Sequence, residues 1–154
     1  MSIDFFNLRD DDGWNPLIVD QSNPNYFWID GRPLTQAPVD VAATFAGAMW
    51  YSTRIDRSFN LDGLRLRANF RMPRHHLNLR QLIIVFGGTL LAGHVGQRQV
   101  GPGEFFVSDA GTPLTLTAGP EGVTYVATQP QPSMTLETYW HECDAWISDQ
   151  EGSR

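Results

Sequence analysis

The sequence predicts an all-β protein, either a β-sandwich or a small barrel, and two observations support this. From residue 59 onward, short apolar runs follow one another at spacings of about 8–12 residues, with turn-forming residues between them. The 14 glycines and 10 prolines of the 154-residue chain show no repeat period, which suits many strands joined by turns. Because 42% of the residues are hydrophobic, the chain can bury one core.

The first 48 residues are predicted to be an irregular extension that packs on the barrel formed by residues 49–154, so that the chain is one domain overall. Two short apolar runs in it can each form a strand, namely Leu17–Val19 and Tyr26–Ile29. The alanine-rich segment Pro38–Met49 either forms a short helix or connects to a strand over Met49–Ile55.

The clearest strand is predicted over Leu64–Met72, where apolar residues occupy the even positions and polar residues the odd ones. This period of two buries one face and turns Arg65, Arg67 and Arg71 outward. Further strands are predicted over Gln81–Phe86, Thr89–Ala92, Gln97–Val100, Glu104–Val107, Leu114–Thr117 and Val123–Thr128, with turns at Gly87-Gly88 and Ala118–Gly122. The segment Thr135–Ile147 forms a last strand or a docked turn.

Composition excludes several classes of function. A formal net charge of −6 makes the chain a poor candidate for nucleic-acid binding. All 11 basic residues are arginine, so lysine Schiff-base chemistry and a phosphate-binding P-loop are excluded. The single Cys143 permits no internal disulfide and has no adjacent base in sequence, so we expect it to be inert. With no signal-like or membrane-spanning stretch, the chain is expected to be cytoplasmic.

The order of motif residues resembles that of a small single-domain cupin over roughly residues 60–130. The residues that carry the resemblance are Pro73-Arg74-His75-His76, Gln81, Gly87-Gly88, Gly101-Pro102-Gly103-Glu104 and Ala110-Gly111-Thr112-Pro113. The resemblance implies a cupin-type antiparallel jelly-roll barrel. In many cupins, the motif G-x5-H-x-H-x3,4-E-x6-G and the motif G-x5-P-x-G-x2-H-x3-N supply three histidines and one acid or glutamine to a divalent metal inside the barrel.

The match to this metal site is degenerate. Six residues separate Gln81 from Gly88, so Gln81 takes the place of the motif's glutamate and His75 that of its first histidine. The second and third histidine positions fall on Leu77 and Leu114. The resemblance therefore implies at most three ligands, His75, His76 and Gln81, for one ion of iron, manganese, nickel or zinc. A protein with no metal is the open alternative.

His75 and His76 are the predicted catalytic residues. Adjacent side chains point to opposite faces of a regular strand, so both can serve one site only if the backbone turns after Pro73. With a metal, the imidazoles would be neutral ligands. Without one, an imidazole would carry a proton near neutral pH. The other two histidines are predicted to lack a role in the site: His94 in a glycine-flanked turn, and His141 as a packing or surface residue.

Three further residues are predicted to contact a substrate. Seven arginines and two aspartates lie between Arg54 and Arg80, which gives a local charge of +5. Arg67 and Arg71 would bind a carboxylate or phosphate, unless this strand face is merely solvated or faces another subunit. Tyr51 would help wall a pocket together with tryptophans outside the strand-rich centre, unless these aromatics pack over the barrel or across a dimer interface.

Together these features predict a cupin enzyme that acts on a small organic molecule in the barrel interior. Its chemistry would be metal-assisted, of dioxygenase or lyase type, or metal-free acid/base chemistry of dehydratase, isomerase or cyclase type. The alternative is a cupin-fold binding or sensor protein without turnover, with an interior lined by Leu77, Ile83, Val85 and Leu114. A homodimer is expected because exposed edge strands need cover. No nucleic-acid or membrane partner is expected.

Overall fold

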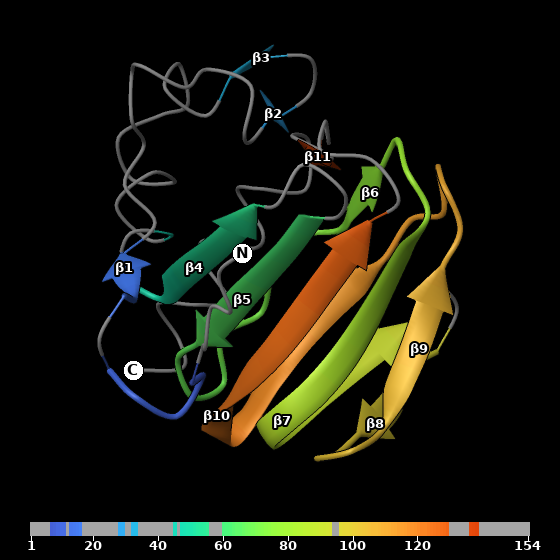
Figure 1. Cartoon of the computed structure of the whole chain (residues 1–154). Coiled ribbons are helices and arrows are strands. Elements are labelled where there is room, and N and C mark those ends of the chain that lie inside the picture. The colour runs from blue at the N-terminus through green and yellow to red at the C-terminus, as the bar shows by residue number, and fades with distance from the viewer. Residues whose placement is uncertain are drawn as a thin grey trace.

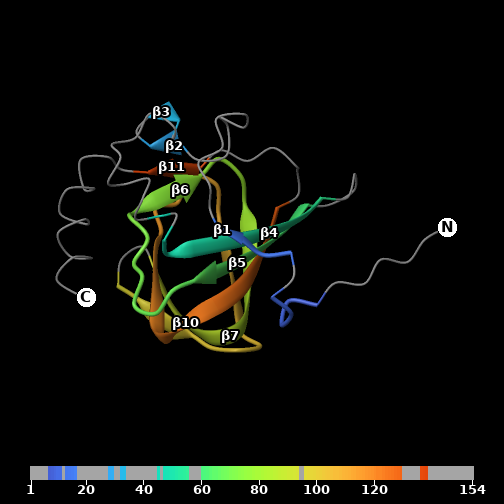
Figure 2. The ribbon, with the colours of Figure 1, turned by 90° about the vertical axis from the view of Figure 1, so that its left-hand side faces the viewer.

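The computed structural model describes residues 7–11, 13–16, 28–29, 32–33, 45, 47–55, 60–93, 96–129 and 136–138. These residues form two β-sheets (Figures 1 and 2). The larger sheet has the order β1 (Asn15–Pro16), β4 (Met49–Ile55), β5 (Asn60–Leu66), β10 (Thr115–Gln129), β7 (Gln81–Gly93) and β8 (Arg98–Val100), and β9 (Phe105–Ser108) also pairs with β7. The smaller sheet has the order β3 (Arg32–Pro33), β2 (Trp28–Ile29), β11 (Leu136–Thr138) and β6 (His75–Leu77).

The connectivity is that of a jelly roll. All strand pairs are antiparallel except β2 with β11. Strand β10 lies between β5 and β7, and β11 lies between β2 and β6, so strands distant in sequence become neighbours as the chain crosses between the sheets. The predicted all-β antiparallel jelly-roll barrel is therefore confirmed.

The core lies between the sheets and is built from alternate residues of the longest strands. Ile83 and Val85 of β7 are fully buried, whereas the residues on either side of them are partly or largely exposed. The rings of Phe45 and Phe70 pack edge to face, with centroids 5.9 Å apart and an interplanar angle of 75°. The largest fully buried side chains are Phe45, Met49, Phe70, Ile83, Val85, Leu90 and Leu116.

The strand predicted over Leu64–Met72 is too long, because β5 ends at Leu66. Asn69 has a φ of 59°, and the Phe70 N–H donates to the Arg67 carbonyl at 3.1 Å, which closes a turn. Asparagine adopts this left-handed conformation more readily than most residues. The predicted alternation survives the turn, since Phe70 is buried again, but the chain now runs toward the smaller sheet.

The predicted breaks at Gly87-Gly88 and at Ala118–Gly122 are also wrong. Strands β7 and β10 run through both positions, and their pairing shifts register between Ala118 and Val123, where four residues of β10 stand against Thr89 of β7. Gly88 has a φ of +68°, and a Cβ atom there would collide with the carbonyl group of Gly122. The glycines therefore let two long strands bend around the barrel instead of ending them.

The N-terminal and C-terminal predictions are met in part. The strand over Met49–Ile55 is confirmed as β4, and β2 lies within the predicted Tyr26–Ile29 run. Strand β11 lies within Thr135–Ile147. Leu17–Val19 and most of Pro38–Met49 lie outside the described residues. In the described part of the chain, no helix is long and apolar enough to cross a membrane.

Candidate functional site

Strand β6 orients the two predicted catalytic histidines. His75 and Leu77 are buried and His76 is only half-buried, so the side chains alternate as on a regular strand. The backbone of His75 forms a bridge with that of Leu114, with N–H···O distances of 3.0 and 2.7 Å. The structure thus brings together the motif positions His75, Leu77 and Leu114 but turns His76 to the opposite face of the strand.

The protonation state of His75 follows from its surroundings. Its Nδ1 atom lies 2.8 Å from the Pro73 carbonyl oxygen, which can only accept, so Nδ1 carries the hydrogen and Nε2 is the acceptor. Burial lowers the pKa of His75 to about 4, and the nearby His76 adds to this effect, although the bond to Pro73 opposes it. The imidazole is therefore neutral at pH 7.

A second buried polar group lies where β7 begins and β10 ends. The Gln129 Nε2 atom donates to Gln81 Oε1 at 3.3 Å, and both side chains are buried. In register, Ser108 of β9 stands opposite Gln81, and Asn60 of β5 stands opposite Gln129. A row of polar residues therefore crosses four strands at one end of the sheet, and Gln81 and Gln129 in this row are buried.

Three of the buried polar residues were not predicted as site residues. Gln129 and Asp62 are buried, with Asp62 opposite Ala127 in register, and the Tyr125 hydroxyl donates to the Met72 sulfur at 4.0 Å. Each lies on the inward face of a strand whose alternation the sequence shows. Extending the period of Val123–Thr128 by one residue would have placed Gln129 inward.

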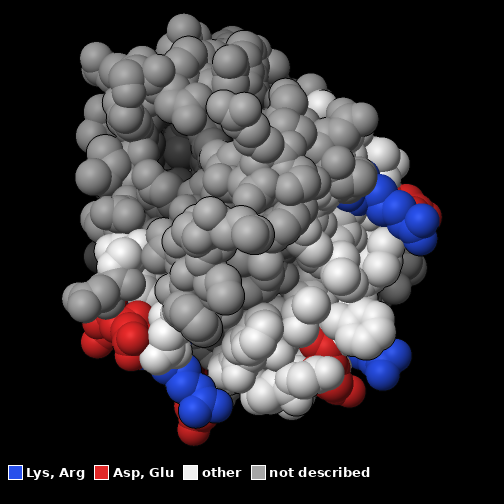
Figure 3. Space-filling model, in the orientation of Figure 1, with Lys and Arg blue, Asp and Glu red and all other residues white. Residues whose placement is uncertain are grey.

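The arginines predicted to contact a substrate are not buried with His75. Arg71 is exposed and Arg67 is half-buried, and no arginine whose side chain is described is buried. On the described part of the face in Figure 3, arginines and acidic side chains alternate instead of forming a basic patch. The backbone of Tyr51 lies in β4 opposite Leu64. The side chain of Tyr51, like His94, His141 and Cys143, lies outside what the structure describes.

The donor set does not fit a divalent metal. Of the four motif positions, Leu77 and Leu114 have no lone pairs to offer, and one of the two lone pairs of Gln81 Oε1 accepts from Gln129. His76 lies on the face opposite to His75, which leaves the Nε2 atom of His75 as the principal donor. No group of three His, Cys, Asp or Glu side chains within the described ranges could hold a metal ion. Protein metal sites use several convergent ligands.

No protein-family model matches the chain, and no curated protein matches it. Solved structures do. A salicylate 1,2-dioxygenase variant from Pseudoaminobacter salicylatoxidans, in complex with gentisate, matches with a TM-score of 0.54 and 14% identity over 60% of this chain and 29% of its own. KdgF from Halomonas sp. matches with a TM-score of 0.50 and 15% identity, over 55% of this chain and 81% of its own.

An RmlC-like cupin from Shewanella frigidimarina matches with a TM-score of 0.51 and 12% identity, over 56% of this chain and 79% of its own. The chain spans less than a third of the salicylate dioxygenase, and identities this low establish the fold alone. The similarity therefore concerns the arrangement of the strands and not the residues of the candidate site. The chain therefore has the fold of the cupin superfamily.

Proposed function

We propose that the barrel interior binds a small, uncharged organic molecule and acts on it without a divalent metal, in a dehydration, isomerisation or cyclisation. The observation that carries this proposal is the buried, neutral His75. Its Nδ1–H is held by the Pro73 carbonyl, so its Nε2 atom is a fixed acceptor for a ligand hydroxyl. The amide groups of Gln81 and Gln129 add a second polar contact that carries no charge.

The buried groups favour an uncharged ligand over an anion. None of the arginines whose side chains are described is a buried residue, which makes the described interior a poor match for a carboxylate or phosphate. Asp62 is the buried acidic residue among the described ones, and it offers no positive charge to an anion. A hydroxyl or carbonyl group on an otherwise apolar molecule matches the remaining lining.

Binding without turnover is the second candidate, and the same histidine supplies the observation that favours it. A pKa of about 4 makes His75 a weak base at neutral pH, where a general base works best with a pKa near the ambient pH. Leu77, Leu114, Ile83 and Val85 are all buried, as expected for an apolar binding interior. A ligand that binds and is recovered chemically unchanged would favour binding without turnover.

The proposal is tested by screening small neutral hydroxy and oxo compounds by ligand-observed NMR, with product analysis of every compound that binds. We expect binding to untagged protein to be unchanged by a chelator, and the purified protein to carry less than stoichiometric metal. Binding that disappears on chelation and returns with one added divalent ion would overturn the metal-free proposal.

The Gln81–Gln129 pair provides a variant test of the same site. Gln81→Leu or Gln129→Leu alone leaves one buried amide without this partner and is expected to cost about 2 kcal/mol of unfolding free energy. The double variant Gln81→Leu/Gln129→Leu replaces both groups by apolar ones, so we expect it to recover most of that loss. It should nevertheless bind the NMR-detected ligands at least tenfold more weakly.

Thr117→Val, on the outward face of β10, is the control for this comparison and should leave binding unchanged. Chemical denaturation gives the stabilities, and NMR titration gives the affinities. If the double variant binds as the wild type does, the pair serves packing and not the ligand.

We further propose that the chain forms a homodimer through the outward face of β7 and β9. Phe105 of β9 is 66% exposed, and Phe86 and Val107 are also exposed. In register, Phe105 stands opposite Ile84, and Val107 stands opposite Leu82, so a two-stranded apolar surface results. A chain with a net charge of −6 repels its own copies, and this uncharged surface is where two copies can approach with least repulsion.

Replacing Phe105 by glutamate is therefore expected to shift the protein from dimer to monomer. The added charge would be buried against its symmetry mate in a two-fold interface. Light scattering at tens of micromolar protein measures the change, and Gln99→Glu, on exposed β8, is the control that should remain dimeric. A wild-type protein that is already monomeric at this concentration would refute the proposal.

A further inference from the structure

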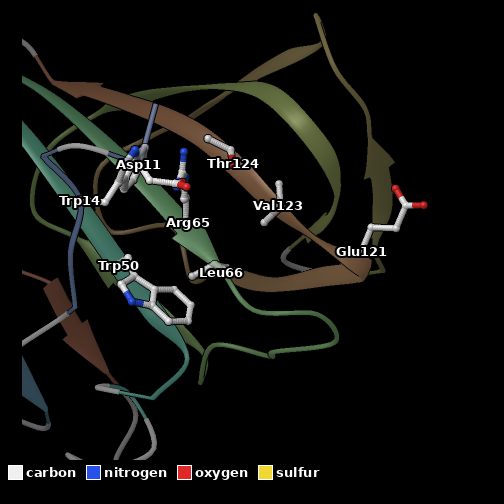
Figure 4. A pocket seen from close by; sticks show the side chains of 8 residues that line it. All are labelled: Asp11, Trp14, Trp50, Arg65, Leu66, Glu121, Val123 and Thr124. Atoms are coloured by element: carbon white, nitrogen blue, oxygen red, sulfur yellow. The ribbon is translucent and has the colours of Figure 1, made fainter. Parts of the chain in front are cut away.

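A groove of about 460 Å³ lies along the larger sheet, and His75 is not among the residues that line it (Figure 4). Its floor follows one cross-strand row in which Trp50 of β4 and Thr124 of β10 flank Arg65 of β5. The full lining is Asp11, Trp14, Trp50, Arg65, Leu66, Glu121, Val123 and Thr124. This volume lies within the range of small-molecule sites.

Arg65 is fixed in this groove by several contacts. Its Nη1 atom donates to Asp11 Oδ1 at 2.8 Å, and its Nη2 atom donates to the carbonyl oxygens of Leu8 and Asp10 at 2.9 and 3.2 Å. Its guanidinium carbon lies 4.2 Å from the centre of the Trp14 ring. The arginine therefore joins the N-terminal segment to β5, and its charge is matched by Asp11.

The groups left to meet a ligand are acidic and aromatic. The Asp11 side chain is 96% exposed, so it can accept further bonds, and the Glu121 carboxylate is also exposed. The half-buried indole of Trp50 lines the same groove, and Glu121 lies at the far end from it (Figure 4). Asp11 and Glu121 line the groove together with the single guanidinium of Arg65, so the lining carries more negative than positive charge and offers few free donors to an anion.

We propose that this groove is a second binding site, which takes an organic cation with a compact apolar body, such as a primary or quaternary ammonium compound. The aromatic face of Trp50 attracts a cation through its ring quadrupole and covers the apolar body. Glu121 and Asp11 supply opposite charge at the open rim, and the acidic chain as a whole attracts cations. This site shares no residue with the interior site.

The test compares three probes that share one phenyl group and differ in charge: phenethylammonium, 2-phenylethanol and 3-phenylpropanoate. Heteronuclear NMR titration of the full chain at low salt measures each affinity. We expect phenethylammonium to bind about tenfold more tightly than the other two, and its affinity to fall as salt is added. Its shift changes should lie at the amides of Trp50, Arg65 and Thr124, and not at His75 or Gln81.

Two matched variants test the charge argument. Glu121→Gln removes a carboxylate from the groove and is expected to weaken phenethylammonium binding about threefold to fivefold. Glu104→Gln removes the same charge from the exposed turn before β9, outside the groove, and should leave the affinity unchanged. Equal affinities for the three probes, shift changes centred on His75, or equal effects of the two variants would each overturn the proposal. Because the interior site is tested with neutral compounds and different variants, either site can fail alone.

Discussion

Lowering the pH from 7.5 to 4 will destabilise the wild-type protein by about 3 kcal/mol more than it destabilises the variant His75→Asn. The pKa of His75 is about 4 in the folded chain, against 6.5 for an ordinary histidine. Between these values the unfolded chain binds a proton at this position and the folded chain does not. The unfolding free energy therefore rises with pH across this window. Above pH 6.5, His75 costs no stability, and at pH 4 nearly all of the stability that its protonation removes has been lost.

Thermal unfolding at half-unit steps of pH measures this effect. For a chain of this length, about 3 kcal/mol corresponds to a difference of about 10 °C in the melting temperature. Other titrating groups contribute to both proteins, so the difference between the two pH curves isolates His75. The control variant His76→Asn should lose nearly as much stability between pH 7.5 and pH 4 as the wild type loses. Burial, and not His76, is the larger cause of the low pKa of His75. Parallel curves for wild type and His75→Asn would show that the imidazole is not buried as a neutral group.

The strand faces could be predicted from the sequence, whereas the ends of the strands could not. The alternation correctly turns Arg71 outward and Phe70 inward, because a period of two decides the face wherever the strand begins. Gly88 looks like a turn residue in sequence. In the fold, its positive φ lies at the register shift between β7 and β10, where Gly88 is pressed against Gly122, a contact between segments that only the pairing of these strands creates.

The candidate site could also be predicted only in part. The spacing of motif residues picked out His75, Gln81 and Leu114, and the structure brings His75 and Leu114 together as backbone neighbours. Gln129 was missed because its bond to Gln81 joins strands 48 positions apart. The low pKa of His75 was missed because it depends on burial by the whole barrel, which no local pattern reveals.

Replacing His75 by asparagine is expected to weaken binding of the NMR-detected ligands about 100-fold while leaving the fold intact at pH 7.5. The amide nitrogen of asparagine can occupy the place of Nδ1 and donate to the Pro73 carbonyl, but nothing replaces Nε2. A ligand hydroxyl would then be buried without its acceptor, at a cost of about 1–3 kcal/mol. If the protein is an enzyme, the turnover rate should fall in addition to the affinity, because Nε2 of His75 would also receive the proton that the substrate gives up.

His75→Gln and His76→Asn complete the comparison. Glutamine reaches the position of Nε2 and restores an acceptor there but loses the bond to Pro73, so we expect partial recovery of affinity together with a lower melting temperature. His76→Asn changes the neighbouring imidazole on the opposite face of β6 and should bind as the wild type does. If His75→Asn and His76→Asn have equal, small effects on affinity, then His75 is a packing residue, and the ligand must contact another part of the barrel.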